Sequence, residues 1–382
     1  MNVTEDRLAR AALTRLFEPN DRTGRALVGH HGAPVALSIA TGATPALPFI
    51  GVTAEELADG LKRWASRIPD LRPEQDLANI QRLDGGFLTP DDEQWPAALN
   101  DLADAPLGLW YRGQIEPGIP DIDKSVALTG SRDSTSYGAS VAGDMAYSLA
   151  QREICIISGL AYGIDANSHR AALAGSTGKL PATIAVLAGG LDRDYPAGNT
   201  DLAAAIRSKG GLTVSELPPG SAPTRYRFLQ RNRIIAALAG VTCVVEARWR
   251  SGALNTAHHA KTLGRAVAAI PGSIHSANSA GCHRLIREDA AVLVTGAEEV
   301  VELLTSRSTT KPEPVQEGLT LEDLILLDAL PHRSTATVEK LSAVAGLSHE
   351  SVRGGLGRLA LLGLAAAERD GWKRRKHDVL SS

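Results

Sequence analysis

Residues 125–165 read SVALTGSRDSTSYGASVAGDMAYSLAQREICIISGLAYGID. Short apolar runs at residues 125–128 and 154–157 are each followed by a glycine-containing turn. A stretch long enough for a helix follows each turn. The first covers residues 136–150, and the second follows residue 165 and ends at about residue 174. Strands that alternate with helices predict a parallel sheet covered by helices. In such sheets ligands bind at the carboxyl ends of the strands, which is where these turns lie.

The same alternation continues as far as residue 304. Further strands are expected at residues 183–187, 212–215, 241–246, 266–270 and 291–294. Helices are expected at residues 199–209, 228–238, 255–263, 282–288 and 297–304. With the first two strands this makes about seven. The sequence therefore predicts an α/β fold of the extended Rossmann-like kind, with a mostly parallel sheet and helices on both faces.

A chain of 382 residues is too long for one ordinary hydrophobic core, so more than one domain is expected. The segment before the sheet divides into two parts. Residues 1–80 space their apolar residues at helical intervals, notably at 7–17 and 54–68, and predict a small helical domain. Residues 81–120 are rich in proline and aromatic residues and predict a connector packed on the sheet domain, residues 121–304. The connector's large rings are expected to hold the N-terminal segment against the sheet. They belong to Trp95, Trp110 and Tyr111.

The segment after the sheet begins with residues 305–318, which are polar, contain two prolines and predict a linker. Residues 319–382 predict a winged-helix-like domain. Its expected elements are a helix at 321–330, a helix-turn-helix pair at 337–345 and 350–362, and a wing from 363–366 and 372–377. Such modules bind duplex DNA or contact proteins. Since the second helix of the pair carries only Arg353 and Arg358, both possibilities stay open.

Composition indicates a globular protein, with 43% apolar and 22% charged residues. No run of about 18 apolar residues indicates a membrane span. The first residues lack the basic and apolar regions of a signal peptide, so a cytoplasmic location is expected. The three cysteines form no close pair, which argues against a disulfide or a zinc site. We expect them to be buried, and they are Cys155, Cys243 and Cys282.

Signals for catalysis are weak. Asp165 and His169 are four residues apart, but no partnered nucleophile or metal-binding set accompanies them. Asp165 is expected to cap the helix that follows it. The pair His30-His31 has no carboxylate at ligand spacing. A P-loop lysine is also missing. No enzymatic activity, metal or cofactor is therefore expected.

Polar turns follow most of the expected strands, and they predict an anion site. TGSR follows residue 128, SG follows 157, AGGLD follows 187 and PGS follows 270. Because parallel strand ends meet at one edge, backbone NH groups, hydroxyls and helix N-termini gather there, which suits phosphate. The first turn has one glycine followed by Arg132, so it is not a dinucleotide fingerprint. An arginine there would reach an anion held by the turn.

A local basic cluster lies further along the chain. Between residues 225 and 250 six arginines face a single carboxylate, Glu246. The run RYRFLQRNR at residues 225–233 interleaves four of them with two aromatic residues. Arginines that follow phosphates and rings that stack on unpaired bases are typical of single-stranded nucleic acid binding. Of Arg231 and Arg233, one is expected to face the strand and the other to pair with Glu216 or Glu246.

Several motifs in series carry a resemblance to a known family. They are SVALTGSR at 125–132, SGLAYGID at 158–165, GGLD at 189–192, YP at 195–196, SE at 215–216, RNRIIA at 231–236, EA at 246–247, RSGALNTA at 250–257 and PG at 271–272. In this order and spacing they resemble the DNA-processing protein A family, DprA, also called Smf. The connector is similar too, so the resemblance covers about residues 85–300.

The resemblance implies a single-stranded DNA-binding recombination mediator without evident catalysis. Members protect incoming DNA during natural transformation (competence) and load the RecA recombinase onto it. They act as homodimers through the sheet domain, here expected to involve Leu285, Ile286 and Val292. The expected DNA-binding residues are Gly130, Ser131, Arg132, Ser158, Gly159, Gly163, Arg225, Phe228, Arg231, Asn232, Arg233, Ser251 and Gly252.

Two departures from the family pattern and two rival functions accompany this expectation. Tyr162 stands where a basic residue is frequent, and Leu229 where proline is usual, which affects the detail of the site. One rival is a nucleotide-binding sensor. The other is a nucleotide-cleaving hydrolase that resembles the lysine-decarboxylase-like phosphoribohydrolases, but their PGGxGTxxE run does not occur in this sequence.

Overall fold

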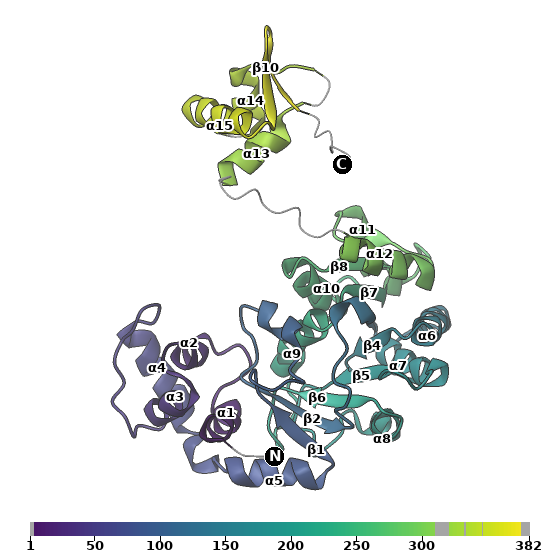
Figure 1. Ribbon diagram of the computed structural model, residues 1–382. Coiled ribbons are helices and arrows are strands. Elements are labelled where there is room, and N and C mark those ends of the chain that lie inside the picture. Colours follow the sequence, from purple (N-terminus) through teal and green to yellow (C-terminus); the bar gives the residue numbers. More distant parts are fainter. Residues whose placement is uncertain (1–3, 310–320, 332–333, 346, 376–382) are drawn as a thin grey trace. The chain divides into compact units, whose positions relative to one another are not determined.

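The computed structural model describes residues 4–309, 321–331, 334–345 and 347–375. The chain forms two compact units, Met1–Ser308 and Thr309–Ser382. The first unit contains the N-terminal helices and a large sheet, and the described part of the second contains three helices and a hairpin (Figure 1). Each unit has its own core of buried apolar side chains.

The sheet of the first unit has nine strands among the described residues, in the order β1-β2-β6-β5-β4-β3-β7-β8-β9. Their bounds are β1 Gly85–Leu88, β2 Leu109–Gly113, β3 Ser125–Gly130, β4 Cys155–Ser158, β5 Thr183–Val186, β6 Leu212–Ser215, β7 Val241–Glu246, β8 Ala266–Ala269 and β9 Val292–Leu293. From β6 to β9 all neighbours are parallel. The expected mostly parallel sheet is confirmed.

The strands β1 and β2 come from the connector, where the sequence predicted no strand. β2 is antiparallel to β6, and β1 is antiparallel to β2. Phe87 faces Trp110 across this pair, and Trp110 in turn faces Ser215 of β6. Trp95, Trp110 and Tyr111 are all buried, as expected for rings that join the connector to the sheet.

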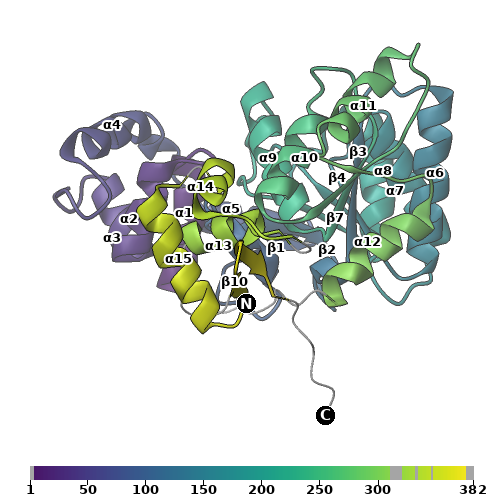
Figure 2. The same ribbon diagram turned by 90° about the horizontal axis from the view of Figure 1, so that it is seen from above.

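Helices cover both faces of the sheet (Figure 2). One face carries α6 Ser136–Gln151, α7 Ile164–Gly175, α8 Thr200–Ser208 and α12 Ala297–Thr309. The other carries α9 Arg225–Ala237, α10 Ala253–Thr262 and α11 Ala280–Arg287. Successive residues of β3 point to opposite faces: Val126 and Leu128 pack in the core with α6, and Ala127 packs in the core with α9. The alternation explains why this central strand is apolar throughout.

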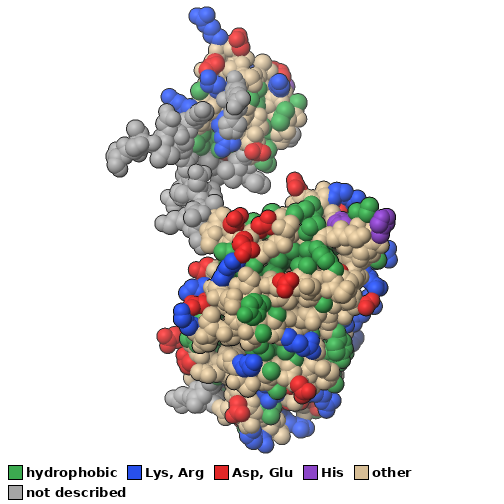
Figure 3. Space-filling model, turned by 90° about the vertical axis from the view of Figure 1, so that its right-hand side faces the viewer, with side chains coloured by type: hydrophobic (Ala, Val, Ile, Leu, Met, Phe, Trp, Pro, Cys, Tyr) green, Lys and Arg blue, Asp and Glu red, His purple; other side chains and the backbone are tan. Residues whose placement is uncertain are grey.

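Basic side chains do not gather on the face covered by α6 and α7. Figure 3 shows Lys and Arg there as separate residues among acidic and apolar ones. Long-range attraction of a polyanion to this face is therefore weak.

The N-terminal helices pack against each other and against the sheet. They are α1 Glu5–Leu16, α2 Arg22–His31, α3 Ala33–Ala40, α4 Ala54–Ala65 and α5 Pro73–Arg82. The indole Nε1 of Trp110 donates to Thr14 Oγ1 at 3.2 Å, and Arg7 donates to Phe87 O and to Asp92. The side chain of Arg15 bonds to Asp76 and to Pro219 O. These contacts fix the helices to the connector and the sheet.

The C-terminal unit contains α13 Leu321–Ala329, α14 Val338–Ala345, α15 His349–Leu361, β10 Ala365–Glu368 and β11 Gly371–Arg374. β10 and β11 form an antiparallel hairpin. Within this unit Arg358 donates to the fully buried carboxylate of Asp323, so its guanidinium stabilises the interior of the unit. Helix α12 runs on to Thr309, inside the segment expected as a linker. The rest of that expected linker, residues 310–318, lies outside the described residues, as do residues 376 and 377 of the expected wing.

Candidate nucleic-acid interface

The chain reverses its direction of growth across the sheet between β3 and β7. From β3 it adds β4, β5 and β6 to one side, and then it returns to place β7 on the other side of β3. Such a switch point leaves a crevice at the carboxyl ends of the strands. A hollow of about 680 Å³ lies here. It is lined by residues 129–132, Ala161, Asp165, Tyr195, residues 223–225, Phe228, Leu229, Arg231, Asn232, Ile235, Arg248, residues 250–253 and Asn255.

The turn after β3 is held closely by its neighbours. The amide of Ser131 donates to Glu246 O at 2.8 Å. The Glu246 carboxylate accepts from the amide and the hydroxyl of Thr135, at 2.9 and 2.6 Å. A side chain at Gly130 would place its Cβ 2.6 Å from Ile164 Cγ1, so only glycine fits. Arg132 follows this fixed turn with its side chain exposed.

The turn after β4 is held in place by hydrogen bonds to β3 and to the first turn of α7. Ser158 Oγ donates to Leu128 O at 2.6 Å, and the amides of Gly159 and Ala161 donate to Asp165 Oδ2 at 3.2 and 3.3 Å. Gly163 adopts φ +74°. The three expected DNA-binding residues of this turn, Ser158, Gly159 and Gly163, do not line the hollow.

The prediction that Asp165 caps α7 is wrong. The helix begins at Ile164 with Gly163 as its N-cap residue, so Asp165 lies inside the first turn. Its carboxylate accepts from the preceding turn because that turn folds back over the helix start. Burial raises the pKa of Asp165, and the nearby Arg231 guanidinium opposes that shift.

Arg231 lies beneath the hollow and binds backbone. Its Nη1 donates to Gly159 O at 2.9 Å and to Val186 O, which ties the ends of β4 and β5 to α9. Burial lowers the pKa of Arg231 to about 10, so the guanidinium stays charged at neutral pH. Its charge lies close to that of Asp165. The residue lines the hollow, but its Nε and Nη1 donate hydrogen bonds within the protein.

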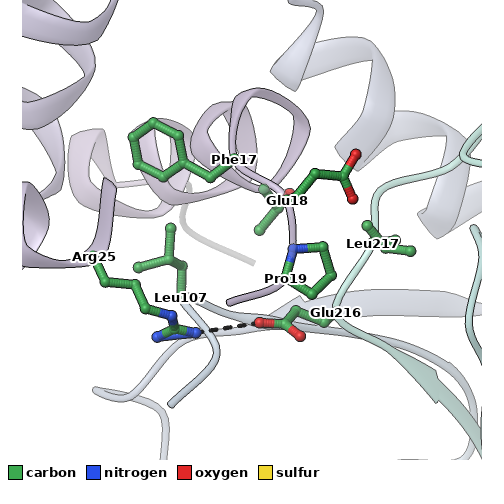
Figure 4. A pocket seen from close by; sticks show the side chains of 8 residues that line it. Phe17, Glu18, Pro19, Arg25, Leu107, Glu216 and Leu217 are labelled. Carbon is green, nitrogen blue, oxygen red and sulfur yellow. Dashed lines mark hydrogen bonds and ion pairs between the residues drawn. The ribbon is translucent and has the colours of Figure 1, made fainter. Parts of the chain in front are cut away.

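Arg233 and Arg227 point away from the hollow toward the N-terminal helices. Arg233 Nη2 donates to both carboxylate oxygens of Glu216, at 2.7 and 2.9 Å, so Arg233 is the structural partner that the sequence left unassigned. Glu216 also accepts from Arg25 of α2 at 3.3 Å (Figure 4). Arg227 bonds to Glu18 at 2.8 and 3.0 Å.

Arg225 differs from the other three arginines of this run. It is the first residue of α9, it is exposed, and within the described part of the chain it has no side-chain hydrogen bond or ion pair. The N-cap of α9 is Thr224, whose hydroxyl accepts from the Arg227 amide at 3.2 Å. The helix therefore starts three residues before the expected position, which presents Arg225 at the hollow.

Phe228 lies between cationic and aromatic groups. The guanidinium carbon of Arg132 is 4.8 Å from its ring centre, and that of Arg231 is 5.8 Å away. The Tyr195 ring centre lies 5.7 Å from that of Phe228. Both separations from arginine are within the range of cation–π attraction. The half-buried ring is thus held in one place at the surface of the hollow.

The loop after β7 closes the opposite side. Asn232 Nδ2 donates to Gly252 O and to Asn255 Oδ1, both at 3.3 Å, and so joins α9 to this loop, which also contributes Ser251. Arg250 is exposed and has no protein partner among the described residues. Tyr195, Arg248 and Arg250 line the hollow, although the sequence did not select them as site residues.

Other reactive side chains have structural partners. His169 Nδ1 lies 2.6 Å from Thr183 Oγ1, and Asp194 pairs with Arg207. The described residues contain no group of three or more His, Cys, Asp or Glu side chains that could hold a metal ion. The three cysteines are free and buried, as expected. Among the helices of the described residues, none is both long and apolar enough to span a bilayer.

The sequence and the fold match known proteins. The family model for DNA recombination-mediator protein A matches residues 86–305. A relative from Mycobacterium tuberculosis that carries the name DprA is 40% identical over 343 residues, which is 85% of each chain.

Two solved structures share the fold. The X-ray structure of DNA processing protein A from Streptococcus pneumoniae has a TM-score of 0.59 and 30% identity, covering 79% of this chain and 98% of that one. The structure of DNA processing protein A from Helicobacter pylori, which concerns its single-stranded DNA binding mode, has a TM-score of 0.51 and 26% identity, covering 58% and 96%.

Proposed function

This chain belongs to the DNA recombination-mediator protein A family, and we propose that it binds single-stranded DNA in the hollow at the switch point. The binding mode described for the Helicobacter pylori relative supports this proposal. The observation that carries it is the placement of Phe228 beside Arg132, with Arg225 and Arg250 at the edges of the same hollow.

The chemistry of this arrangement suits an unpaired strand. Arg132, Arg225 and Arg250 are exposed cations without ion-pair partners in the described residues, so they can bind successive phosphates. The ring of Phe228 offers a face for stacking, which any base accepts once it is unpaired. In a duplex the bases are already stacked, and the ring gains no contact. Single strands should therefore bind more tightly than duplexes.

The proposal extends to the role of the protein in the cell. The protein protects incoming single strands and loads RecA during natural transformation, in the cytoplasm and without catalysis. It acts as a homodimer through the sheet unit. The edge strand β9 supports this, because Val292 and Leu293 are 52% and 47% exposed. Leu285 of α11, also expected at the dimer surface, is instead buried in the core that α11 shares with α10.

The fold of the first unit is proposed to be an extended Rossmann-like domain, residues 121–304, with a helical domain at residues 1–80 and the connector at 81–120. Residues 319–382 are proposed to form a winged-helix module. Because Arg358 is bonded to Asp323, the exposed Arg353 is the remaining arginine of α15 for DNA. That supports a protein contact for this module over duplex DNA.

A gel-shift comparison tests the function. We expect a labelled single-stranded oligonucleotide to be retarded at lower protein concentration than the matching duplex, and RecA assembly on the strand to be faster with the protein present. Equal retardation of both forms would contradict the proposal. A mononucleotide that displaces a long oligonucleotide at equal concentration would favour a nucleotide sensor.

A further inference from the structure

A second hollow lies on the other side of the first turn of α9. It has a volume of about 450 Å³ and is lined by Leu16, residues 18–23, Arg63, Trp64, Arg67 and Tyr226. Arg225 lines the hollow at the sheet edge, and the next residue, Tyr226, lines this one. Two consecutive residues of one helix turn thus reach two separate hollows.

The walls of the second hollow come from α1, α2, α4, the segments that follow α1 and α4, and Tyr226 of α9. They carry three arginines and two carboxylates. Both carboxylates are engaged. Glu18 accepts from Arg67 at 2.6 Å and from Arg227 at 2.8 Å. The side chain of Asp21 is only 8% exposed, and it accepts from the Gly24 amide at 3.0 Å and from Trp64 Nε1 at 2.8 Å. Both carboxylates of the wall are therefore bound by donors of the protein itself.

The arginines at the opening are much more accessible. Arg22 is exposed and has no partner within the described residues. The Arg63 side chain is 54% exposed, and its contact with Asp21 is a long 3.4 Å. Exposed cations of this kind can bind phosphate without breaking a strong ion pair.

Tyr226 adds an aromatic surface between the two hollows. It is 50% exposed, whereas Trp64 below it is 1% exposed. An exposed ring beside accessible arginines matches the composition of single-strand binding surfaces. Tyr226 directly follows Arg225, which lines the first hollow, so a strand that leaves Arg225 meets this ring next.

We propose that the second hollow receives the continuation of the same DNA strand, so that the N-terminal helices form the second part of a two-part single-strand site. This inference rests on the proposed function of the first hollow. It assigns to α2 and α4 a direct contact with DNA through Arg22 and Arg63, with Tyr226 stacking on a base between the two parts.

The test is a length series of oligothymidylates, from about 4 to about 16 nucleotides, titrated against the full chain. The variants are Arg22→Ala with Arg63→Ala, and separately Tyr226→Ala and Tyr226→Phe. Lys62→Ala is the matched control, since Lys62 is an exposed cation beside Arg63 on α4 that does not line the hollow. Thermal unfolding confirms that each variant is folded.

We expect the double arginine variant to weaken binding of the longest oligonucleotide about 5- to 10-fold and to leave the shortest unchanged. Tyr226→Ala should act similarly, and Tyr226→Phe should bind like the parent. The inference is overturned if the double variant matches Lys62→Ala at every length, or if its loss is the same for short and long strands.

Failure of the inference can be told from failure of the proposed function. If Arg132→Ala weakens binding at every length while the second-hollow variants change nothing, only the inference is wrong. If the unmodified chain binds no single strand of any length, the proposed function is wrong and the inference with it.

Discussion

The guanidinium carbon of Arg132 lies 4.8 Å from the centre of the Phe228 ring. Arg132 follows β3 and Phe228 belongs to α9, so the contact joins the turn after β3 to the helix that leads into β7. A cation and a stacking surface are thereby held together before any ligand arrives. Such preorganisation lowers the entropy cost of binding a flexible strand.

Removal of the accessible arginines should weaken binding without unfolding the protein. We expect Arg132→Ala or Arg225→Ala to cost about 1–3 kcal/mol of binding free energy and to reduce the salt slope by about 1 each. Anisotropy titrations at two salt concentrations measure both quantities. Arg170→Ala, an exposed arginine outside the hollow, is the control. An unchanged affinity in both variants would show that the strand binds elsewhere.

The ring of Phe228 should contribute by stacking. We expect Phe228→Ala to cost about 1–3 kcal/mol of binding free energy, the range for one stacked base. Phe228→Tyr should retain most of the affinity because it keeps the ring. Titration with an oligothymidylate and with an abasic strand of equal length separates stacking from phosphate binding. The variant should lose affinity for the first strand only, and equal losses would argue against stacking.

Arg231 should matter for stability. Arg231→Ala leaves Gly159 O and Val186 O without this donor and Asp165 without its nearby positive charge. Each buried acceptor left without a donor typically costs about 1–3 kcal/mol of unfolding free energy. Arg225→Ala, at an exposed position, should change it by less than about 0.5 kcal/mol. Urea denaturation measures both. Similar, small losses in the two variants would contradict a structural role for Arg231.

His169 should make stability depend on pH. Burial lowers the pKa of His169 to about 3, so the folded protein keeps it neutral while the unfolded chain takes up a proton below about pH 6.5. The unfolded state therefore binds more protons between these values, and stability falls as the pH decreases, by about 2 kcal/mol at pH 5. His169→Gln removes this contribution. Denaturation at pH 7 and pH 5 should show a smaller loss in the variant, and parallel losses would refute the prediction.

The parallel part of the fold could be predicted because each of its strands is a short apolar run followed by a polar turn. β1 and β2 could not be predicted in the same way. Gly85 and Gly86 have low strand propensity, and the pair exists because Trp110 and its neighbours bond to β6, which is distant in the sequence. Non-local pairing of this kind leaves little local signal.

The position of the candidate site could be predicted from the sequence, but the roles of its individual side chains could not. The sequence placed Arg231 and Arg233 on one helix and named Glu216 as a possible partner. It could not show that Arg231 lies under the ends of β4 and β5, because its acceptors are backbone carbonyls. Tyr195 was missed as a lining residue for a similar reason: its contact with Phe228 depends on where the loop after β5 folds.

The most direct test of the central claim is a crystal structure of the protein with an oligothymidylate. We expect a phosphate within hydrogen-bond distance of Arg132 and another near Arg225, with a base stacked on Phe228. A strand bound away from the switch-point hollow, with no contact to Arg132 or Phe228, would contradict this proposal.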